Sequence, residues 1–425
     1  MTDTRWTSIP PIVRAALAAS FLVAVLAATA TAGPLEEAVV AYDRGDYATA
    51  SALYLPLAEQ GSTAAQYSLG FMYATGRGVP QNFAVSMNWY RKAADQGNAS
   101  AQNNLGVMYA EGQGVPRDYA EAARWYRKAA EQGNPLARNN LGFMYANGQG
   151  LPQDMAEAVK WFRQAADQGD ANAQYNLGLF TASGRGVPHD DGEAVNWFRK
   201  AADQGDAGAQ YNLGFMYASG RGTPKDYVEA AKWFRKAADQ GNAAAQYNLG
   251  VMYTDGQGVP QDDAEAMKWN RKAADQGSAE AQFSVGFIYA NGRGIPRDDV
   301  EAVKWFRKAA DQGNANAQNS LGFMHANGRG VSRDSAEAAK WYRKAADQGD
   351  AAAQYNLGVV YDTGQGVPQD LVQAHKWYNL AAARFPTSEA QNREQATRSR
   401  DMAAAKMTPA QIAEAQKLAS EWKPN

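Results

Sequence analysis

The sequence of 425 residues contains no cysteine and only three histidines. The absence of cysteine excludes disulfide frameworks, thiolate zinc sites and cysteine nucleophiles. His189, His325 and His375 lie far apart and show no metal-ligand spacing. Lysine and arginine number 42 against 44 aspartate and glutamate, so the chain lacks the strong basic excess of nucleic-acid-binding proteins. We therefore expect no metal, no cofactor and no nucleic-acid partner.

Long apolar runs are also scarce, and the one that exists lies near the N-terminus. Residues 15–30 carry only Ser and Thr as polar members, follow two arginines and precede an Ala-Thr-Ala sequence that ends at Ala32. The run is shorter than the ~20 residues of a membrane span, and the pattern is typical of a secretory signal peptide. We predict that residues 1–32 are a signal peptide and that the protein is exported to the periplasm. Full secretion and an uncleaved N-terminal anchor are the alternatives; no further membrane span is expected.

Tryptophan and glycine recur with a period of 36 residues, from Trp89 to Trp377 and from Gly70 to Gly358. Nine units in unbroken register fill residues 61–384. A period of this length indicates a solenoid, in which each unit buries its apolar face only against its neighbours.

The unit at residues 205–240 predicts two helices. Ala209, Leu213 and Tyr217 recur at every fourth position, which places them on one face of a first helix, helix A. Gly214 removes a side chain where another backbone is expected to come close. The Gly-Arg-Gly-Thr-Pro segment that follows ends helix A before the second helix begins.

The second helix, helix B, has clear start and stop signals. Asp226 is a good N-cap, Glu229 completes a capping-box pattern, and Gly241 is expected to end the helix as a C′ glycine. The same acidic pairing recurs as Asp118/Glu121, Asp154/Glu157, Asp190/Glu193, Asp262/Glu265, Asp298/Glu301 and Asp334/Glu337. These carboxylates therefore have a structural explanation, and we assign them no acid–base catalysis.

The unit resembles the Sel-one-like repeat (SLR), a relative of the tetratricopeptide repeat, in its segments AQYNLGFMYASGRG, D-x-x-E-A and W-F-R-K-A-A. The resemblance covers about three quarters of the chain. It implies an all-α fold, an α/α superhelical solenoid of nine 36-residue SLR/TPR-like helix-turn-helix repeats. It also implies a protein-binding adaptor or regulator in a secretory or periplasmic pathway.

Atypical segments at both ends are expected to cover the terminal repeats. Residues 33–60 read as an N-terminal capping half-repeat, whose second helix carries Ala48 and Ala52. Residues 385–425 are predicted to form C-terminal capping helices, and Thr408 before a proline is a strong helix start. The C-terminal segment could instead be an arm that docks a partner.

Helix A carries the candidate binding residues. In tetratricopeptide-like superhelices this helix lines the concave surface, and the resemblance places aromatic and asparagine side chains of each unit in that groove. Asparagine amides both donate and accept hydrogen bonds, so a ladder of them can bind an extended peptide while aromatic rings contact its side chains. The predicted groove residues are Tyr67, Asn104, Asn140, Tyr175, Asn176, Tyr211, Asn212, Phe215, Tyr247, Asn248, Phe283, Tyr355 and Asn356.

An equally weighted alternative is that these asparagines bond to neighbouring repeats and the aromatic rings pack between repeats. The columns carry no basic stripe, which argues against a clamp for acidic tails or phosphorylated peptides. Departures from the pattern are candidate specificity points, among them Asn270 in place of an aromatic residue and His325 in place of a tyrosine. His325 in an apolar slot is more typical of a packed core histidine than of a ligand.

No catalytic constellation is recognisable. The S-x-x-K match from Ser420 to Lys423 lacks its companion motifs, and the glycine-rich loops lack the Lys-Ser or Lys-Thr of a phosphate-binding loop. We therefore expect a non-enzymatic, exported interaction scaffold that binds a polypeptide in its concave groove and regulates an envelope or signalling system. The alternatives are a secreted factor that binds a host or foreign-cell protein, and a receptor for a glycan or small ligand.

Overall fold

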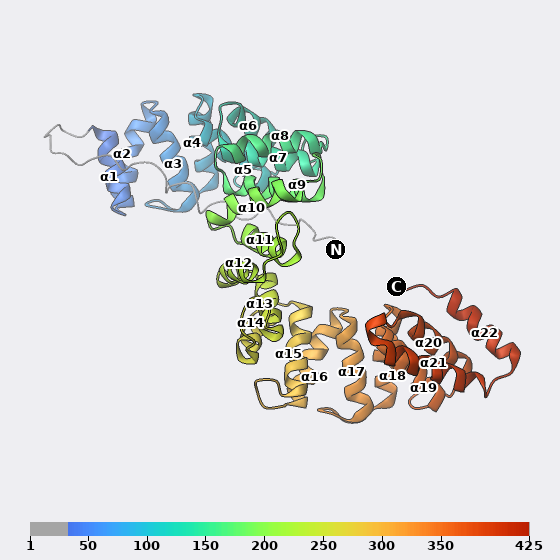
Figure 1. Cartoon of the computed structure of the whole chain (residues 1–425). Coiled ribbons are helices and arrows are strands. Elements are labelled where there is room, and N and C mark those ends of the chain that lie inside the picture. The colour runs from blue at the N-terminus through green and yellow to red at the C-terminus, as the bar shows by residue number, and fades with distance from the viewer. Residues whose placement is uncertain (1–32, 425) are drawn as a thin grey trace. The chain divides into compact units, whose positions relative to one another are not determined.

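The computed structural model of the protein describes residues 33–424 (Figure 1). These residues form 22 α-helices and one short 3-10 helix, and they contain no strand. The predicted all-α class is therefore confirmed. The predicted signal peptide, residues 1–32, lies outside the described part of the chain. None of the described helices is long and apolar enough to cross a membrane.

Nine helix pairs follow one another with regular bounds. The first helices, helix A of each repeat, are α3 (Thr63–Thr75), α5 (Ala99–Glu111), α7 (Pro135–Asn147), α9 (Ala171–Ser183), α11 (Ala207–Ser219), α13 (Ala243–Asp255), α15 (Ala279–Asn291), α17 (Ala315–Asn327) and α19 (Ala351–Thr363). The second helices, helix B, are α4 (Phe83–Asp95), α6 (Tyr119–Glu131), α8 (Met155–Asp167), α10 (Asp191–Asp203), α12 (Tyr227–Asp239), α14 (Asp263–Asp275), α16 (Asp299–Asp311), α18 (Ser335–Asp347) and α20 (Leu371–Arg384). The flanking elements are α1 (Pro34–Asp43), α2 (Tyr47–Glu59), η1 (Thr387–Glu389), α21 (Ala390–Ala404) and α22 (Pro409–Ser420).

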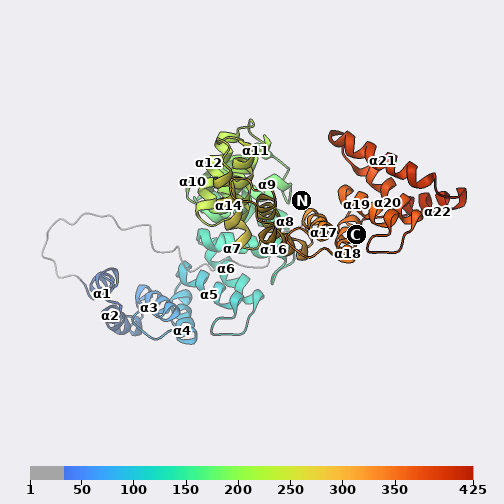
Figure 2. The same cartoon turned by 90° about the horizontal axis from the view of Figure 1, so that it is seen from below.

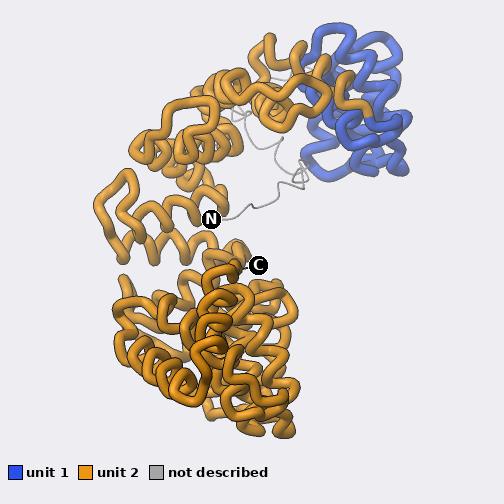
Figure 3. The backbone as a smooth tube through the Cα atoms, turned by 90° about the vertical axis from the view of Figure 1, so that its right-hand side faces the viewer, with its two compact units in different colours: residues 1–117 blue, residues 118–425 orange. Residues whose placement is uncertain are grey.

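The helices belong to two compact units, residues 1–117 and 118–425 (Figure 3). In the first unit, each helix from α1 to α5 packs on the next one along the chain. In the second unit the same holds from α6 to α20, and α20 also contacts α21 and α22 (Figure 2). Each helix thus packs chiefly on its sequence neighbours, which is the arrangement of a solenoid.

The core of a repeat combines alanine with one large aromatic ring. In the repeat formed by α11 and α12, Ala209, Leu213 and Ala230 are completely buried and Phe234 is 2% exposed. Small alanine side chains let the helix axes approach closely, and the ring fills the remaining space. The Trp233 ring on α12 belongs to the same buried cluster as Trp269 of the next repeat. The regular 36-residue spacing of tryptophan therefore produces packing between repeats.

Gly214 makes room for an aromatic ring of helix B. A Cβ atom at Gly214 would lie 2.8 Å from Cδ1 of Phe234 and 3.2 Å from the carbonyl oxygen of Ala230. The sequence predicts a close approach by another backbone, but the nearest group is this side chain, with the backbone second. Any larger residue at position 214 must therefore displace the ring.

The glycine-rich loop after helix A contacts the preceding repeat. Gly222 has φ +65°, and a Cβ atom there would lie 2.1 Å from the carbonyl oxygen of Asp191 at the start of α10. Only glycine fits both the left-handed backbone and this contact. The loops predicted as simple turns therefore also fix the register between successive repeats.

The start of helix B uses half of the predicted capping box. Asp226 accepts hydrogen bonds from the backbone N–H groups of Val228 and Glu229, as an N-cap does. The reciprocal bond from Glu229 is not formed, because the Asp226 N–H already donates to the carbonyl oxygen of Tyr217. The Glu229 carboxylate pairs with Lys232 instead, at 2.6 Å. The prediction of a complete capping box at these sites is thus wrong in its second half.

In most repeats a buried glutamine of helix A bonds both to the preceding repeat and to a glutamine at the end of helix B of its own repeat. The Gln210 Nε2 donates to the carbonyl oxygen of Ala202 at 3.1 Å, and Gln240 Nε2 donates to the Gln210 side-chain oxygen at 2.8 Å. Gln210 is 4% exposed, so these bonds satisfy amide groups that would otherwise be costly to bury. The same link joins Gln66 to Gln96 in the first unit. The sequence interpretation overlooked this ladder.

Helices at both chain ends cover the terminal repeats. On α2, Ala48 and Ala52 are exposed, whereas Ala50 and Tyr54 are buried. At the other end Thr408 begins α22 with a complete capping box. The Trp422 ring after this helix meets Trp377 of the last repeat edge-on, with ring centroids 6.1 Å apart.

Candidate functional site

The candidate surface consists of three rows of side chains on the A helices. The first row is Tyr67, Asn103, Asn139, Tyr175, Tyr211, Tyr247, Phe283, Asn319 and Tyr355. The second row, four residues further along each helix, is Phe71, Val107, Phe143, Leu179, Phe215, Val251, Phe287, Phe323 and Val359. The amide row is Asn104, Asn140, Asn176, Asn212, Asn248 and Asn356. All six amide-row residues are half-buried.

The aromatic residues of the first row pack on helix B of their own repeat. The Tyr211 and Phe234 rings have centroids 5.8 Å apart, and the Tyr175 and Phe198 rings 6.2 Å. The corresponding pairs elsewhere are Tyr67–Tyr90, Phe283–Phe306 and Tyr355–Tyr378, at 5.5 to 5.8 Å. Such tilted contacts stabilise a core beyond the area that they bury. These predicted groove residues therefore carry a packing role.

First-row tyrosines also reach the following repeat. A Cβ atom at Gly208, on the next A helix, would lie 3.0 Å from the Tyr175 ring. Burial raises the pKa of Tyr175, as does the charge of Asp206, and a side-chain hydrogen bond with Asn212 partly offsets the rise. Burial likewise raises the pKa of Tyr67 and Tyr247, which hydrogen-bond to Asn104 and Ser284 of their next repeats. These hydroxyls stay neutral and link successive A helices.

The asparagines of the amide row form several different contacts. Asn176 donates to the Asn139 side chain at 2.9 Å, and Asn356 donates to Asn319 at the same distance. Asn212 instead donates to the carbonyl oxygen of Gly208 in its own helix, at 2.9 Å. Within residues 33–424, the Asn248 side chain has no hydrogen-bond partner. Cross-repeat bonds between two amides thus occur at Asn139 and Asn319, where the first row carries asparagine, as the packing alternative requires. The use of these residues by a partner stays a prediction.

Two rings of the second row are the most accessible aromatic groups of the surface. Phe287 on α15 and Phe323 on α17 are each 44% exposed, whereas Phe215 is half-buried against the core. All three rings belong to the column that was predicted to line the groove, although only Phe215 is among the predicted contact residues. The residue type is the same in all three repeats, so only the surrounding packing distinguishes them. Phe287 and Phe323 are therefore the column members that the structure adds to the candidate contact residues.

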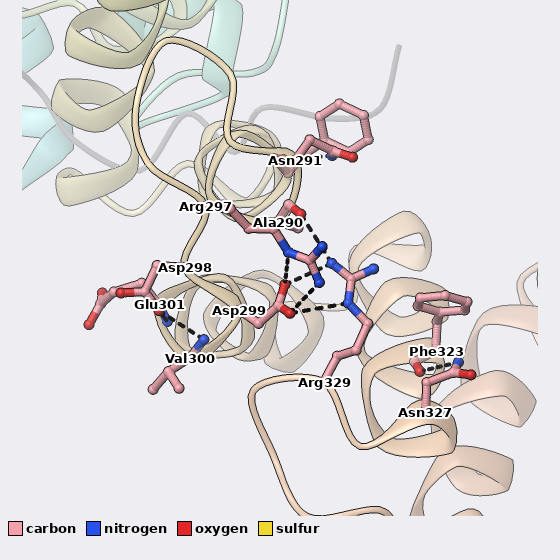
Figure 4. A network of polar contacts seen from close by, with 11 residues as sticks. Ala290, Asn291, Arg297, Asp298, Asp299, Val300, Glu301, Phe323, Asn327 and Arg329 are labelled. Carbon is pink, nitrogen blue, oxygen red and sulfur yellow. Dashed lines mark hydrogen bonds and ion pairs between the residues drawn. The ribbon is translucent and has the colours of Figure 1, made fainter.

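A polar network borders Phe323 (Figure 4). The Asp299 carboxylate accepts hydrogen bonds from both Arg297 and Arg329, and these two guanidinium groups hold its pKa far below its usual range. The Arg329 guanidinium carbon lies 5.8 Å from the Phe323 ring centroid. Asp299 thus holds the Arg329 guanidinium beside the exposed ring.

Amide oxygens also accompany the exposed rings. The Asn291 Nδ2 donates to the Phe287 carbonyl oxygen at 2.8 Å, and Asn327 Nδ2 donates to the Phe323 carbonyl oxygen at 2.9 Å (Figure 4). Both asparagines are exposed. Each donor is thereby fixed, while the amide oxygen is left to accept a hydrogen bond. Ring, amide and guanidinium together offer apolar and polar contacts in adjacent repeats.

The two departures from the repeat pattern are both buried. Asn270 is 1% exposed, and its Oδ1 has no hydrogen-bond partner in the described part of the chain. His325 is 6% exposed and its Nε2 lies 3.2 Å from Arg307, the position at which other repeats pair arginine with tyrosine. Burial, and then Arg307, lowers the pKa of His325. This environment agrees with the interpretation of His325 as a core residue.

The model of the Sel1 repeat matches nine consecutive segments that run from residue 63 to residue 384. The matched segments are 63–98, 99–134, 135–170, 171–206, 207–242, 243–278, 279–314, 315–350 and 351–384. The chain belongs to the Sel1 repeat family. Each Sel1 repeat begins with helix A, so its start lies two residues after the start of the corresponding 36-residue unit in the sequence analysis.

Solved Sel1 repeat structures agree with this assignment. A protective antigen present in uropathogenic Escherichia coli strains, which displays an SLR fold, is 35% identical with a TM-score of 0.62, covering 92% of this chain and 91% of that one. A Sel1 repeat protein from Oxalobacter formigenes is also 35% identical with a TM-score of 0.54, covering 77% and 93%. A search of curated proteins found no match. The predicted family and the α/α solenoid are thus confirmed, and Sel1 repeats typically serve as protein-interaction scaffolds.

Proposed function

We propose that this Sel1 repeat protein is an exported, non-catalytic scaffold that binds a polypeptide partner on its A helices. The observation that carries the proposal is the pair of exposed rings, Phe287 and Phe323, at equivalent positions of adjacent repeats. Exposed large rings at matching positions of neighbouring repeats are typical of a surface that a partner covers. Aromatic residues are also enriched at the centre of protein interfaces.

The chemistry beside these rings favours a polypeptide as the partner. Asn291 and Asn327 supply amide oxygens, which suit the N–H groups of a bound backbone. The two rings provide contacts for apolar side chains. Arg329 adds a cation that is only partly neutralised, because it shares Asp299 with Arg297. A segment with apolar side chains and a nearby acidic residue fits this combination.

The proposed export rests on the sequence of residues 1–32, with its apolar run and Ala-Thr-Ala end. An exported scaffold without enzymatic groups acts by holding or restraining its partner. We therefore place the protein in the regulation or assembly of an envelope or signalling system. Cell fractionation with N-terminal sequencing tests the export step: a periplasmic chain that begins at Gly33 is expected, and a cytoplasmic full-length chain would contradict it.

A secreted factor that binds a host or foreign-cell protein is the second candidate. The observation that favours it is the 35% identical structure described as a protective antigen present in uropathogenic Escherichia coli strains. The same fractionation separates the two candidates, because a factor that acts on another cell must appear in the medium or on the cell surface. Retention in the periplasm supports the regulatory scaffold.

Affinity capture with matched variants tests the binding surface. The bait is the chain from Gly33, and the test variant carries Phe287→Ser and Phe323→Ser. The control carries Val228→Ser and Val300→Ser, which remove two apolar side chains of similar exposure, 52% and 53%, from the starts of B helices. We expect a polypeptide that the parent and the control retain and the test variant loses. Equal retention by all three chains would place the binding site elsewhere.

If no polypeptide is retained, a glycan or small ligand becomes the better explanation of the exposed rings. That outcome is recognised by a rise in melting temperature when the ligand is added, because a ligand that binds only the folded chain stabilises it.

A further inference from the structure

An open cavity of about 540 Å³ lies between α20 and α21. Figures 1 and 2 show these helices next to one another at the C-terminal end of the second unit. Alanines at positions 382, 383 and 390 line it, so no large side chain fills the space. Its volume is within the range of small-molecule sites.

One face of α21 turns three polar side chains into this cavity. Arg393, Thr397 and Arg400 line it and are spaced by four and three residues, which places them on the same side of the helix. Asn379 lines the opposite wall on α20. The cavity thus has an apolar floor of alanine and a polar side supplied by two helices.

Hydrogen-bond donors in the cavity exceed acceptors. The Arg393 guanidinium forms no hydrogen bond or ion pair with any residue among 33–424, so its five N–H groups are available. Asn379 uses its oxygen to accept from Arg400 at 3.3 Å, which leaves its NH₂ group free to donate. The Thr397 hydroxyl donates to the Arg393 carbonyl oxygen and is left as an acceptor.

The nearby carboxylates are already engaged. Glu394 lines the cavity but pairs with Arg398, which is not among the lining residues. Asp401 accepts two hydrogen bonds from Arg400, at 2.9 and 2.8 Å, which fixes the Arg400 guanidinium. Arg398 and Arg400 each have a carboxylate partner, and Arg393 has none among residues 33–424. The uncompensated charge in the cavity is therefore positive.

We propose that this cavity binds a small molecule through its carboxylate or phosphate group. An oxyanion supplies the acceptors that the wall lacks, and a guanidinium with the amide of Asn379 can hold its oxygens from two directions. The alanine floor leaves room for the remainder of the molecule. A small oxyanion differs from the polypeptide proposed for the A helices, so this cavity adds a second ligand class to the scaffold.

Titration calorimetry at low ionic strength tests the proposal on the intact chain from Gly33. The probes are inorganic phosphate and glutarate, with glycerol as a neutral probe of similar size. We expect saturable binding of phosphate or glutarate and no binding of glycerol. The anion that binds more tightly shows whether the cavity prefers a phosphate or a carboxylate group. If neither anion binds at concentrations up to about 10 mM, the binding free energy is weaker than ~3 kcal/mol and the proposal is overturned. Equal binding of glycerol would overturn it as well.

Three variants locate the binding. Arg393→Gln removes the unpaired cation. We expect it to lower the affinity for the anion at least about tenfold, because one charge-assisted hydrogen bond is lost. Ala383→Leu fills an exposed part of the wall without a change in charge and should also weaken binding. Lys417→Gln, on α22 and outside the cavity, makes the same charge change and should bind as the parent does. If Arg393→Gln and Ala383→Leu both bind as tightly as the parent, the proposal is wrong.

Discussion

Two rows of aromatic residues run along the same A helices, only four residues apart, yet they lie in different environments. Tyr211 of the first row packs on Phe234, whereas Phe287 of the second row is 44% exposed. The first row therefore stabilises the solenoid, and the second row leaves two rings partly exposed to a partner, although Phe287 also contacts the Phe283 ring. A periodic aromatic column is thus not by itself a binding site, because repetition produces packing columns in the same pattern.

Gly214→Val is the strongest way to break the packed row. The new side chain meets the Phe234 ring, on which Tyr211 stacks, and the Ala230 carbonyl oxygen. We expect the free energy of unfolding to fall by roughly 2 to 4 kcal/mol, measured by thermal and urea melting followed by circular dichroism. An unchanged melting curve would contradict the assigned packing of α11 on α12.

Tyr211→Ala should have a smaller but clear effect. The ring is half-buried, so its removal is expected to cost about 1 to 3 kcal/mol, less than a fully buried ring. Differential scanning calorimetry of the parent and variant checks this value. A loss below about 0.5 kcal/mol, as at ordinary surface sites, would return Tyr211 to the candidate binding residues.

Asn270→Phe should restore the missing ring of the sixth repeat. In five other repeats a helix-B ring packs on the aromatic residue of the first row. In the sixth repeat Tyr247 has no such partner, because Asn270 occupies the helix-B position. The variant also removes a buried amide oxygen without a partner. A gain of about 1 kcal/mol is expected from melting experiments; a loss of stability would show that the site cannot accept a ring.

His325→Tyr should reduce the sensitivity of the fold to acid. The folded protein has a lowered pKa at His325, caused first by burial and then by Arg307, with Asp334 and Glu337 acting in the opposite direction. The unfolded chain has a histidine pKa of about 6.5, so below that pH it binds more protons at this site than the folded chain does. The free energy of unfolding therefore keeps its full value above about pH 6.5 and declines as the pH falls towards the folded pKa.

Melting temperatures of the parent and His325→Tyr between pH 7.5 and pH 5 check this expectation. The lowered pKa of His375 is shared by both chains and serves as a common background. Parallel curves for the two chains would show that His325 contributes nothing to the acid response.

Phe287→Ser with Phe323→Ser should have the smallest effect on stability. Both rings are 44% exposed and make few contacts, so we expect each change to lower the free energy of unfolding by roughly 0.5 to 1 kcal/mol. Urea melting beside the Tyr211→Ala variant measures the contrast between the two rows directly. A cost as large as that of Tyr211→Ala would show that the second row is also structural.

The period of the sequence was sufficient to predict the fold. Trp233, Gly214 and Asp226 each recur with fixed spacing, and each position has a local physical reason that one repeat reveals. The Gln210–Gln240 hydrogen bond lies within one repeat, and it was missed because two glutamines thirty residues apart give no sequence signal that their side chains meet. The contact of Gly222 with Asp191 was missed because it joins residues of different repeats.

The site was harder to predict than the fold. Tyr175 and Asn212 were both placed on the candidate surface, and both are there, but their hydrogen bond to one another depends on how adjacent repeats stack. Phe215 and Phe287 have the same residue type and register, so no sequence pattern separates the half-buried ring from the exposed one. Exposure is set by side-chain packing in three dimensions, and the period carries no information about it.

The most direct test of the proposed binding surface is photo-crosslinking in the cell that produces the protein. A photo-reactive phenylalanine analogue is placed singly at positions 287 and 323, and at 228 and 300 as exposed controls on B helices. We predict one common crosslinked polypeptide from positions 287 and 323, and none from 228 and 300. Crosslinks only from the control positions, or none from position 287 or 323, would contradict a partner on the A helices.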